Sequence, residues 1–269
     1  MIEQTTETGD TMKITALVEN TTNDKNFSCE HGLSLYVETK NHKILFDTGQ
    51  SSLFYENAKK LNIDLRDVDI CILSHGHYDH GGGLSTFLSV NKKADVYMNE
   101  NCFMDYYNGE KYIGLDKLLR DNPRIIKTSD EFIIDSEFSL FTCNNNSKNY
   151  ELGSFGLSKK TGEKLVDDDF LHEHYLLINE DGNKVLISGC SHKGILNIKD
   201  WFDAKTVIGG FHFSKLLCDN TLADYAKILE KTGITFYTCH CTGVEQYEYM
   251  KHYMNNLHYI STAETIEIL

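Results

Sequence analysis

Short runs of apolar residues, rich in β-branched and aromatic side chains, recur along the whole chain between turn-forming Gly, Asn, Asp and Ser residues. Short runs bounded in this way are typical of β-strands. Turn residues at 41–42 and 181–183 separate neighbouring runs and predict hairpins there. The predicted strands cover residues 14–18, 33–37, 43–46, 68–73, 95–98, 132–134, 138–141, 175–178, 184–187, 206–208, 235–239 and 265–269.

Helical patterns lie between these strands. In one of them, Leu222, Tyr225, Ala226 and Leu229 fall at positions i, i+3, i+4 and i+7, which places them on one apolar stripe of a surface helix. The early strands follow one another through turns, whereas the later strands alternate with helices. This order predicts an α/β class in which helices cover sheets within one domain. The predicted helices cover residues 52–61, 83–90, 193–202, 222–231 and 244–254.

The domain organisation follows from where this pattern weakens. Residues 1–12 are polar and acidic and predict a flexible N-terminal tail, so the folded domain is expected to span residues 13–269. Residues 99–169 fit the pattern least well, since they contain the sole proline, many Asn and Lys residues and a Tyr-rich stretch. We expect this segment to be an insertion that forms a lid or an oligomer contact, which leaves a homo-oligomer open.

The composition indicates which class of molecule the protein binds. Lys and Arg number 26 and Asp and Glu number 40, a formal net charge of −14, and no basic patch interrupts the acidic balance. Such a charge repels phosphate backbones and anionic lipid headgroups, so we expect a small-molecule substrate, no nucleic acid and no membrane. No apolar stretch reaches the roughly 18 residues of a membrane span, and the N-terminus lacks a signal peptide's apolar core. We therefore expect a cytoplasmic protein whose eight cysteines are reduced thiols.

One segment concentrates the side chains that bind metals. Directly after the predicted strand 68–73, three histidines and one aspartate occur within six residues, at His75, His77, Asp79 and His80. His75 and His77 point to one side of an extended backbone, because side chains alternate with period two. Imidazole and carboxylate ligands suit zinc, iron or manganese. A His-rich polar loop without a metal is the alternative interpretation.

The segment His75-x-His77-x-Asp79-His80 after a buried strand resembles the signature of the metallo-β-lactamase superfamily. Residues 45–49, Leu-Phe-Asp-Thr-Gly, lie upstream where that superfamily has a strand ending in Asp-x-Gly. The resemblance extends from residue 13 to the C-terminus. It implies an αββα sandwich of two mixed sheets flanked by helices, with metals at one edge of the paired sheets.

The resemblance also implies a set of metal ligands. His75 and His77 would bind the first metal, and Asp79 and His80 would bind the second. Asp47 would orient a ligand histidine by a hydrogen bond. Two divalent ions are therefore expected, with zinc favoured and iron or manganese as alternatives.

Later loops supply further candidates. Strand 184–187 runs into Cys190 and His192, where most relatives have a bridging aspartate. We favour His192 as a metal ligand over His172 and His174, because the latter two lead into a strand instead of following one. Cys190 is ambiguous between a coordinating or bridging thiolate and a buried structural thiol. Strand 235–239 ends in His240, which matches the final ligand of the second metal.

Three other residues are candidates for lining the pocket. His212 follows the strand 206–208, and Glu30 and His31 open an early strand, each with an ordinary surface or core role as the alternative. With the loops at 190–195 and 240–243, these residues narrow the resemblance to the subgroup named for the dihydropterin–ribofuranosyl-aminobenzene-phosphate synthase.

The resemblance implies a metal-dependent hydrolase in which metal-activated hydroxide cleaves an ester, lactone or phosphoester, with Asp79 as the candidate catalytic proton shuttle. Three rivals remain: a di-iron redox protein, a non-catalytic metal-binding protein, and a synthase-like transferase. The transferase would act on a strongly anionic substrate. Apart from Lys193, the motif loops offer few cations for such a substrate, which disfavours it.

Overall fold

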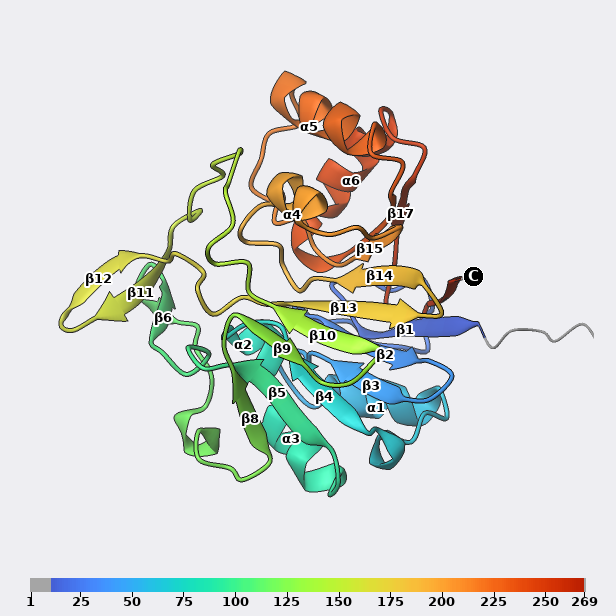
Figure 1. Ribbon diagram of the computed structural model, residues 1–269, viewed down its shortest axis with the longest axis vertical. Coiled ribbons are helices and arrows are strands. Elements are labelled where there is room, and N and C mark those ends of the chain that lie inside the picture. The colour runs from blue at the N-terminus through green and yellow to red at the C-terminus, as the bar shows by residue number, and fades with distance from the viewer. Residues whose placement is uncertain (1–10, 269) are drawn as a thin grey trace, which may run out of the picture.

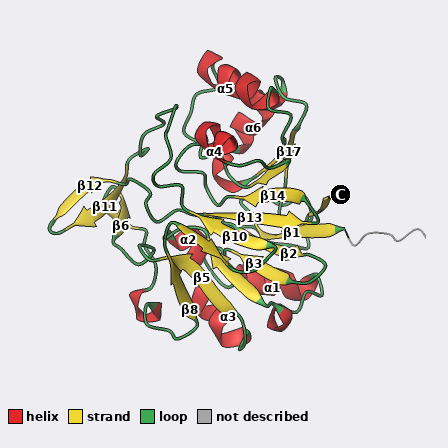
Figure 2. Cartoon of the chain, viewed as in Figure 1, coloured by secondary structure: helices red, strands yellow, loops and turns green. Residues whose placement is uncertain are grey.

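A computed structural model describes residues 11–268 of the chain (Figure 1). Two seven-stranded sheets face each other, and helices cover the outer face of each sheet (Figure 2). This four-layer arrangement confirms the predicted αββα sandwich. Most of the predicted tail lies outside the described residues, but Met12 is buried and already belongs to β1.

The first sheet has the order β18-β1-β2-β3-β4-β5-β8. Its strands are antiparallel from β18 to β3 and parallel from β3 to β8. The predicted hairpin joins β2 to β3. The strands are β1 (Met12–Val18), β2 (Ser34–Glu38), β3 (Lys43–Phe46), β4 (Ile70–Leu73), β5 (Asp95–Asn99), β8 (Ile125–Thr128) and β18 (Thr265–Ile268).

The second sheet has the order β17-β16-β15-β14-β13-β10-β9. Its strands are antiparallel from β9 to β14, where the second predicted hairpin lies, and parallel from β14 to β17. The strands are β9 (Glu131–Ile133), β10 (Phe138–Phe141), β13 (Tyr175–Glu180), β14 (Asn183–Ile187), β15 (Thr206–Ile208), β16 (Thr235–Thr238) and β17 (Leu257–Tyr259).

The helices form the two outer layers. α1 and α3 pack on the first sheet, and α4, α5 and α6 pack on the second. Between residues 11 and 268, no helix combines the length and apolar character needed to cross a membrane. The helices are α1 (Leu53–Lys60), α2 (Tyr78–Gly81), α3 (Leu84–Val90), α4 (Ile195–Trp201), α5 (Asn220–Glu230) and α6 (Val244–Lys251), with short 3₁₀ turns at Leu65–Asp67, Lys117–Leu119 and His240–Thr242.

The central strands are buried on both faces, which explains their continuous apolar runs. In β4, Ile70 and Ile72 pack into the core between the two sheets. Cys71 and Leu73 point the other way and pack beneath α1 and α3. This strand therefore holds a fixed position between two apolar layers, and the loop that follows it starts from a rigid support.

The segment 99–169 divides into two parts. Strands β8, β9 and β10 complete the two main sheets, so this part is integral to the sandwich. The remainder contains a separate four-stranded sheet of order β12-β11-β6-β7, which projects beside the sandwich (Figure 1). Most residues of these strands are exposed or half-buried and several are lysines, so their hydrophobic pattern is weak. They are β6 (Tyr106–Asn108), β7 (Lys111–Tyr112), β11 (Leu157–Thr161) and β12 (Lys164–Asp167).

A substitution between the sheets should destabilise the protein far more than one on an exposed strand. Phe138 in β10 is fully buried in the core between the sheets, whereas Ile133 in β9 is 65% exposed. We expect Phe138→Ala to lower the free energy of unfolding by about 3–5 kcal/mol, because it leaves a cavity. The control Ile133→Ala should change it by about 0.5 kcal/mol or less. Urea denaturation measures both free energies of unfolding. Similar losses for the two variants would contradict the placement of Phe138 in the core between the sheets.

Candidate metal centre

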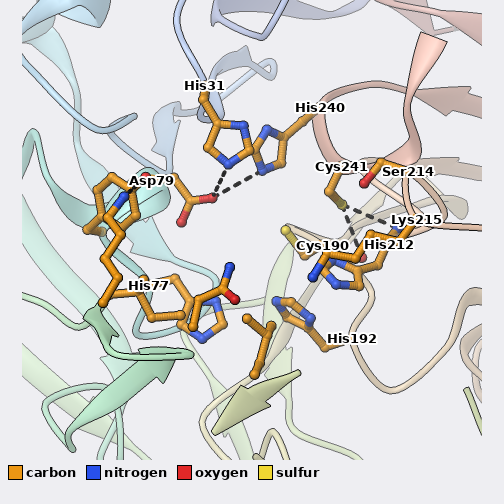
Figure 3. Close-up of a pocket in the computed structure, with 15 residues that line it drawn as sticks. His31, His77, Asp79, Cys190, His192, His212, Ser214, Lys215, His240 and Cys241 are labelled. Carbon is orange, nitrogen blue, oxygen red and sulfur yellow. Dashed lines mark hydrogen bonds and ion pairs between the residues drawn. The ribbon is translucent and has the colours of Figure 1, made fainter. Parts of the chain in front are cut away.

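Most of the polar residues singled out in the sequence come directly after β4, β14, β15 and β16, whereas Asp47 follows β3 and Glu30 and His31 precede β2. Strands β14, β15 and β16 are parallel neighbours, so their carboxyl ends share one edge of the sandwich, where α/β proteins commonly bind ligands. Figure 3 shows side chains from these segments around one pocket. The residues that meet in this region are His75, His77, Asp79, His80, Cys190, His192, His212 and His240.

The loops reach these positions through unusual backbone conformations. His212 and His240 adopt left-handed φ values of 56° and 48°. Gly209, at the end of β15, has φ of 133°, and a Cβ atom there would lie 1.8 Å from the carbonyl oxygen of Ser188. Non-glycine residues held in the left-handed region carry local strain of a kind that clusters at functional sites.

Asp47 is a fully buried carboxylate directly after β3. Its Oδ1 accepts a hydrogen bond from the Ser74 backbone N–H at 2.7 Å, and its Oδ2 accepts from the Ser74 hydroxyl at 2.8 Å and from Nδ1 of His80 at 2.6 Å. Burial lowers the pKa of His80, but the Asp47 carboxylate outweighs it and raises that pKa to about 9. A positive charge on the other ring nitrogen, from either a proton or a metal ion, is therefore favoured. Asp47 thus orients His80 and increases its basicity.

Two groups of three donor atoms, each with two histidines, share the thiol of Cys190. In one group, Nε2 of His80 lies 3.1 Å from Sγ of Cys190 and 3.2 Å from Nε2 of His240. In the other group, Cys190 lies with His75 and His192, whose Nε2 atoms are 3.3 Å apart. Such separations suit donors around one zinc ion, because Zn–N and Zn–S bonds are about 2.0 and 2.3 Å long. Cys190 therefore lies where its thiol could contribute to either group.

The chemistry of the donor set fits divalent metals. Burial holds the pKa values of His75 and His192 well below the usual range, so both rings are neutral, which is the form that binds metals. Nδ1 of His192 and Nε2 of His77 are buried without hydrogen-bond partners. Burial raises the pKa of the Cys190 thiol, but a coordinating metal would deprotonate it. Neutral imidazoles and a thiol are thus buried together, a donor set that a divalent cation would satisfy.

His77 lies beside His75, with ring centroids 4.6 Å apart, and contacts a buried acid that sequence reasoning missed. Nε2 of His77 is 3.6 Å from Oδ2 of Asp168, and Nε2 of His172 donates to the same oxygen at 3.1 Å. The Gly76 backbone N–H donates to Nδ1 of His172 at 2.8 Å. Asp168 and His172 therefore hold the loop that carries His75 and His77 in place. Together with His77 they also form another group of possible ligands.

Asp79 faces the pocket between two histidines. Its Oδ2 lies 3.1 Å from Nε2 of His31 and 3.5 Å from Nε2 of His240, as Figure 3 shows. Burial opposes ionisation of Asp79, but these contacts outweigh it and hold its pKa well below the usual range. His31 thus belongs to the site. Glu30 lies elsewhere: its carboxylate accepts hydrogen bonds from the backbone and hydroxyl of Ser51, and it does not line this pocket.

His212 and a second cysteine complete one side of the pocket. The His212 ring lies 4.3 Å from that of His192, and its backbone N–H donates to Sγ of Cys241 at 3.3 Å. Cys241 forms a further group of possible ligands with Cys190 and His212. The only sequence signal for Cys241 was its position next to His240.

His174 does not belong to this arrangement. It is fully buried, and burial lowers its pKa to about 3. Its Nδ1 lies 3.5 Å from the Thr128 hydroxyl, and it does not line the pocket. His174 thus belongs to none of the groups of possible ligands found in the described residues, whereas His172, which was set aside with it, belongs to one.

The pocket contains cations that the sequence motifs did not suggest. It opens to solvent and is concave, as sites for small molecules are. Lys111 and Lys215 line it, from β7 and from the loop after β15. Lys193, the one cation expected in the motif loops, is instead buried, and its ammonium donates to the carbonyl oxygens of Thr142 and Glu173. The motif loops themselves add no other lysine to the lining of the pocket. The inference that the pocket has few cations was wrong, because two lysines line it from segments outside these motifs.

Proteins of known sequence resemble this chain over most of its length. It is 31% identical over 266 residues to the 7,8-dihydropterin-6-methyl-4-(beta-D-ribofuranosyl)-aminobenzene-5'-phosphate synthase of Methanocaldococcus jannaschii, covering 87% of this chain and 88% of the relative. An uncharacterized protein of the same organism is 31% identical over 243 residues, covering 86% of this chain and 90% of the relative.

Solved structures and a family model are also similar to this chain. Tm1679, described as a metal-dependent hydrolase of the beta-lactamase superfamily, superposes with a TM-score of 0.81 at 29% identity, covering 96% of this chain and 99% of that one. Zn²⁺-bound PqqB from Methylobacterium extorquens, at 10% identity and a TM-score of 0.57, shares the fold, covering 94% of this chain and 99% of that one. The model of the metallo-beta-lactamase superfamily matches residues 28–228. With this match and the ligand-bearing loops described above, the chain belongs to the metallo-beta-lactamase superfamily.

Proposed function

We propose that this protein is a metal-dependent hydrolase that cleaves an ester, lactone or phosphoester bond of a small molecule at a dinuclear centre. The observation that carries the proposal is the pair of three-donor groups that share Cys190 and border one open pocket. A donor set of imidazoles, one thiol and one carboxylate suits zinc best, and also accepts iron or manganese.

The two groups divide the ligands between two ions. His75 and His192 would hold one ion together with Cys190, with His77 beside them. His80 and His240 would hold the second ion with Cys190. Asp79 lies 3.5 Å from His240, on the side of the second ion. Bound divalent ions supply an acidified water and polarise a carbonyl or phosphoryl oxygen.

The chain's own residues would transfer the proton and orient the ligands. Asp79 is ionised and faces the pocket, so it can accept a proton from a nucleophilic water and pass it on. The side chain of His31 is 55% exposed and contacts the same carboxylate oxygen, which gives that proton a path to solvent. Asp47 keeps His80 aimed at the centre.

A synthase-like transferase is the second candidate. The relative named as an aminobenzene-phosphate synthase favours it, and so do the two lysines in the pocket, because such a substrate is anionic. The similarity to Tm1679, described as a metal-dependent hydrolase, favours hydrolysis. The two activities differ in the acceptor: a hydrolase turns over with water alone, whereas the transferase requires an aminobenzoate-type second substrate.

Loss of one metal-binding histidine should remove both metal and activity. For His75→Ala we expect fewer bound ions per chain and at least a roughly hundredfold lower hydrolysis rate, because the first ion loses a ligand. Asp79→Asn should lower the rate similarly while circular dichroism shows an intact fold. Elemental analysis and assays with ester, lactone and phosphodiester panels measure these effects, with His258→Ala, at an exposed position of β17, as the control.

Several outcomes would contradict the hydrolase. Metal-free wild-type protein with full activity would exclude a metal mechanism. Full metal occupancy with no turnover on any panel would favour a non-catalytic metal-binding protein. Turnover only in the presence of an aminobenzoate acceptor would favour the transferase, and iron with oxygen consumption would favour a di-iron redox protein.

The Asp47 carboxylate should set the metal affinity. Asp47→Asn removes the charge that orients His80, and we expect a roughly 10- to 100-fold weaker affinity for Zn²⁺. Competition with a chromogenic chelator measures this affinity. Asp95→Asn, an exposed change on β5, is the matched control and should bind Zn²⁺ as the wild type does. Unchanged affinity in Asp47→Asn would show that Asp47 has no role in metal binding.

Metal removal should reveal a pH dependence of stability. In the metal-free protein the pKa of His80 is about 9, above its unfolded value of about 6.5. The stabilisation is therefore fully present below about pH 6.5 and is lost as pH rises through 9, by about 3 kcal/mol. Urea denaturation with chelator at pH 6.5, 8 and 9.5 should show this loss. Asp47→Asn should flatten the trend, and an equally steep trend in that variant would assign it to another group.

A further inference from the structure

The lining of the pocket carries more positive than negative side chains, although the molecule as a whole is strongly negative. The chain carries a net charge of −14, yet the pocket is lined by two lysines and by a single carboxylate, Asp79. That carboxylate is already engaged by His31 and His240. Bound metal ions would make the lining still more positive. The surroundings of a substrate are therefore cationic, which favours an anion.

Lys111 lies on one wall of the pocket, in the small four-stranded sheet. Its ammonium donates a hydrogen bond to the Tyr78 hydroxyl at 3.0 Å and lies 4.5 Å from the centre of the Tyr78 ring. Tyr78 directly precedes Asp79, and its backbone N–H donates to the carbonyl oxygen of Ile113 at 2.8 Å. These contacts tie the cation and its wall to the metal-binding loop.

Lys215 lies on another wall, in the loop between β15 and α5. Its ammonium donates to the carbonyl oxygen of Phe155 at 2.7 Å. The neighbouring Ser214 backbone N–H donates to the carbonyl oxygen of Cys241 at 3.0 Å, so this loop is anchored to the loop that carries His240. Figure 3 shows Ser214 and Lys215 beside Cys241 and His212.

Neither ammonium has a carboxylate partner among residues 11–268, unlike Lys117 and Lys159 near the same wall, which pair with Asp105 and Asp169. An anion can therefore bind Lys111 and Lys215 without breaking an ion pair.

A neutral donor accompanies each lysine. Asn108 pairs with Lys111 across the β6–β7 hairpin, and Ser214 precedes Lys215. Within the described chain, the Asn108 amide and the Ser214 hydroxyl have no hydrogen-bond partner of their own. The pocket thus offers an ammonium group and a neutral donor on each of two walls, and a phosphorylated molecule has several acceptor oxygens for such donors. A lysine ammonium binds phosphate as a point charge.

We propose that Lys111 with Asn108, and Lys215 with Ser214, bind the phosphate oxygens of a phosphorylated substrate, away from the bond that reacts. The substrate is then a small phosphorylated molecule. This inference rests on the proposed function only in naming the bound molecule as the substrate. Lys111 and Lys215 are specificity-determining residues, whereas the metal-binding histidines are common to any substrate.

Binding without turnover tests the inference. Isothermal titration calorimetry of Zn²⁺-loaded protein with β-glycerol phosphate measures Kd for the wild type, Lys111→Met, Lys215→Met and the double variant. We expect roughly a tenfold higher Kd for each single variant and a larger loss in the double variant. Lys160→Met is the matched control, because Lys160 is exposed on β11 of the same small sheet and does not line the pocket. Zn²⁺ content should be the same in all of these proteins.

The possible results separate the two proposals. Equal Kd values for the wild type and both lysine variants, or no binding to the wild type, would overturn the inference. Glycerate that binds as tightly as glycerol phosphate, with the same dependence on the lysines, would replace phosphate by carboxylate and also overturn it. Lysine-dependent phosphate binding in a protein that hydrolyses none of the panels would support it and contradict the hydrolase instead.

Discussion

The buried carboxylate of Asp47 connects the parts of the molecule on which metal binding depends. It lies at the end of β3, and its hydrogen bonds reach the backbone and side chain of Ser74 at the end of β4 and the ring of His80 in α2. A buried charge is costly unless it is fully hydrogen-bonded, and here three donors meet that requirement. The same bonds that stabilise the carboxylate therefore fix the register of two strands and the direction of one metal-binding ring.

Much of the fold and of the centre could be predicted from the sequence, because the signals are either repeated or local. Central strands such as β4 are apolar on both faces, so they stand out as continuous runs. The His75-to-His80 segment concentrates its ligands within one turn, where spacing alone constrains their geometry. His192 and His240 could be inferred because each follows a strand, and parallel strands end at the same edge.

The rest depended on contacts between distant segments. Asp168 meets His77 only through the path of the chain around the small sheet, and nothing near Asp168 marks it as a partner of an imidazole. Cys241 was visible only as a neighbour of His240. Lys111 belongs to short exposed strands that have little hydrophobic pattern, so their pairing, and hence the lysine's place in the pocket, could not be predicted from the sequence.

The small four-stranded sheet has a consequence for how such a protein changes over evolutionary time. Its own core is a cluster of four buried residues, Tyr106, Ile113, Leu157 and Phe170, separate from the three clusters that stabilise the sandwich. Substitutions on its exposed hairpins therefore cost the sandwich little stability. The exposed hairpins of this wall can therefore diversify without loss of the sandwich, so one metal-binding site can be retained while the molecules that reach it are exchanged.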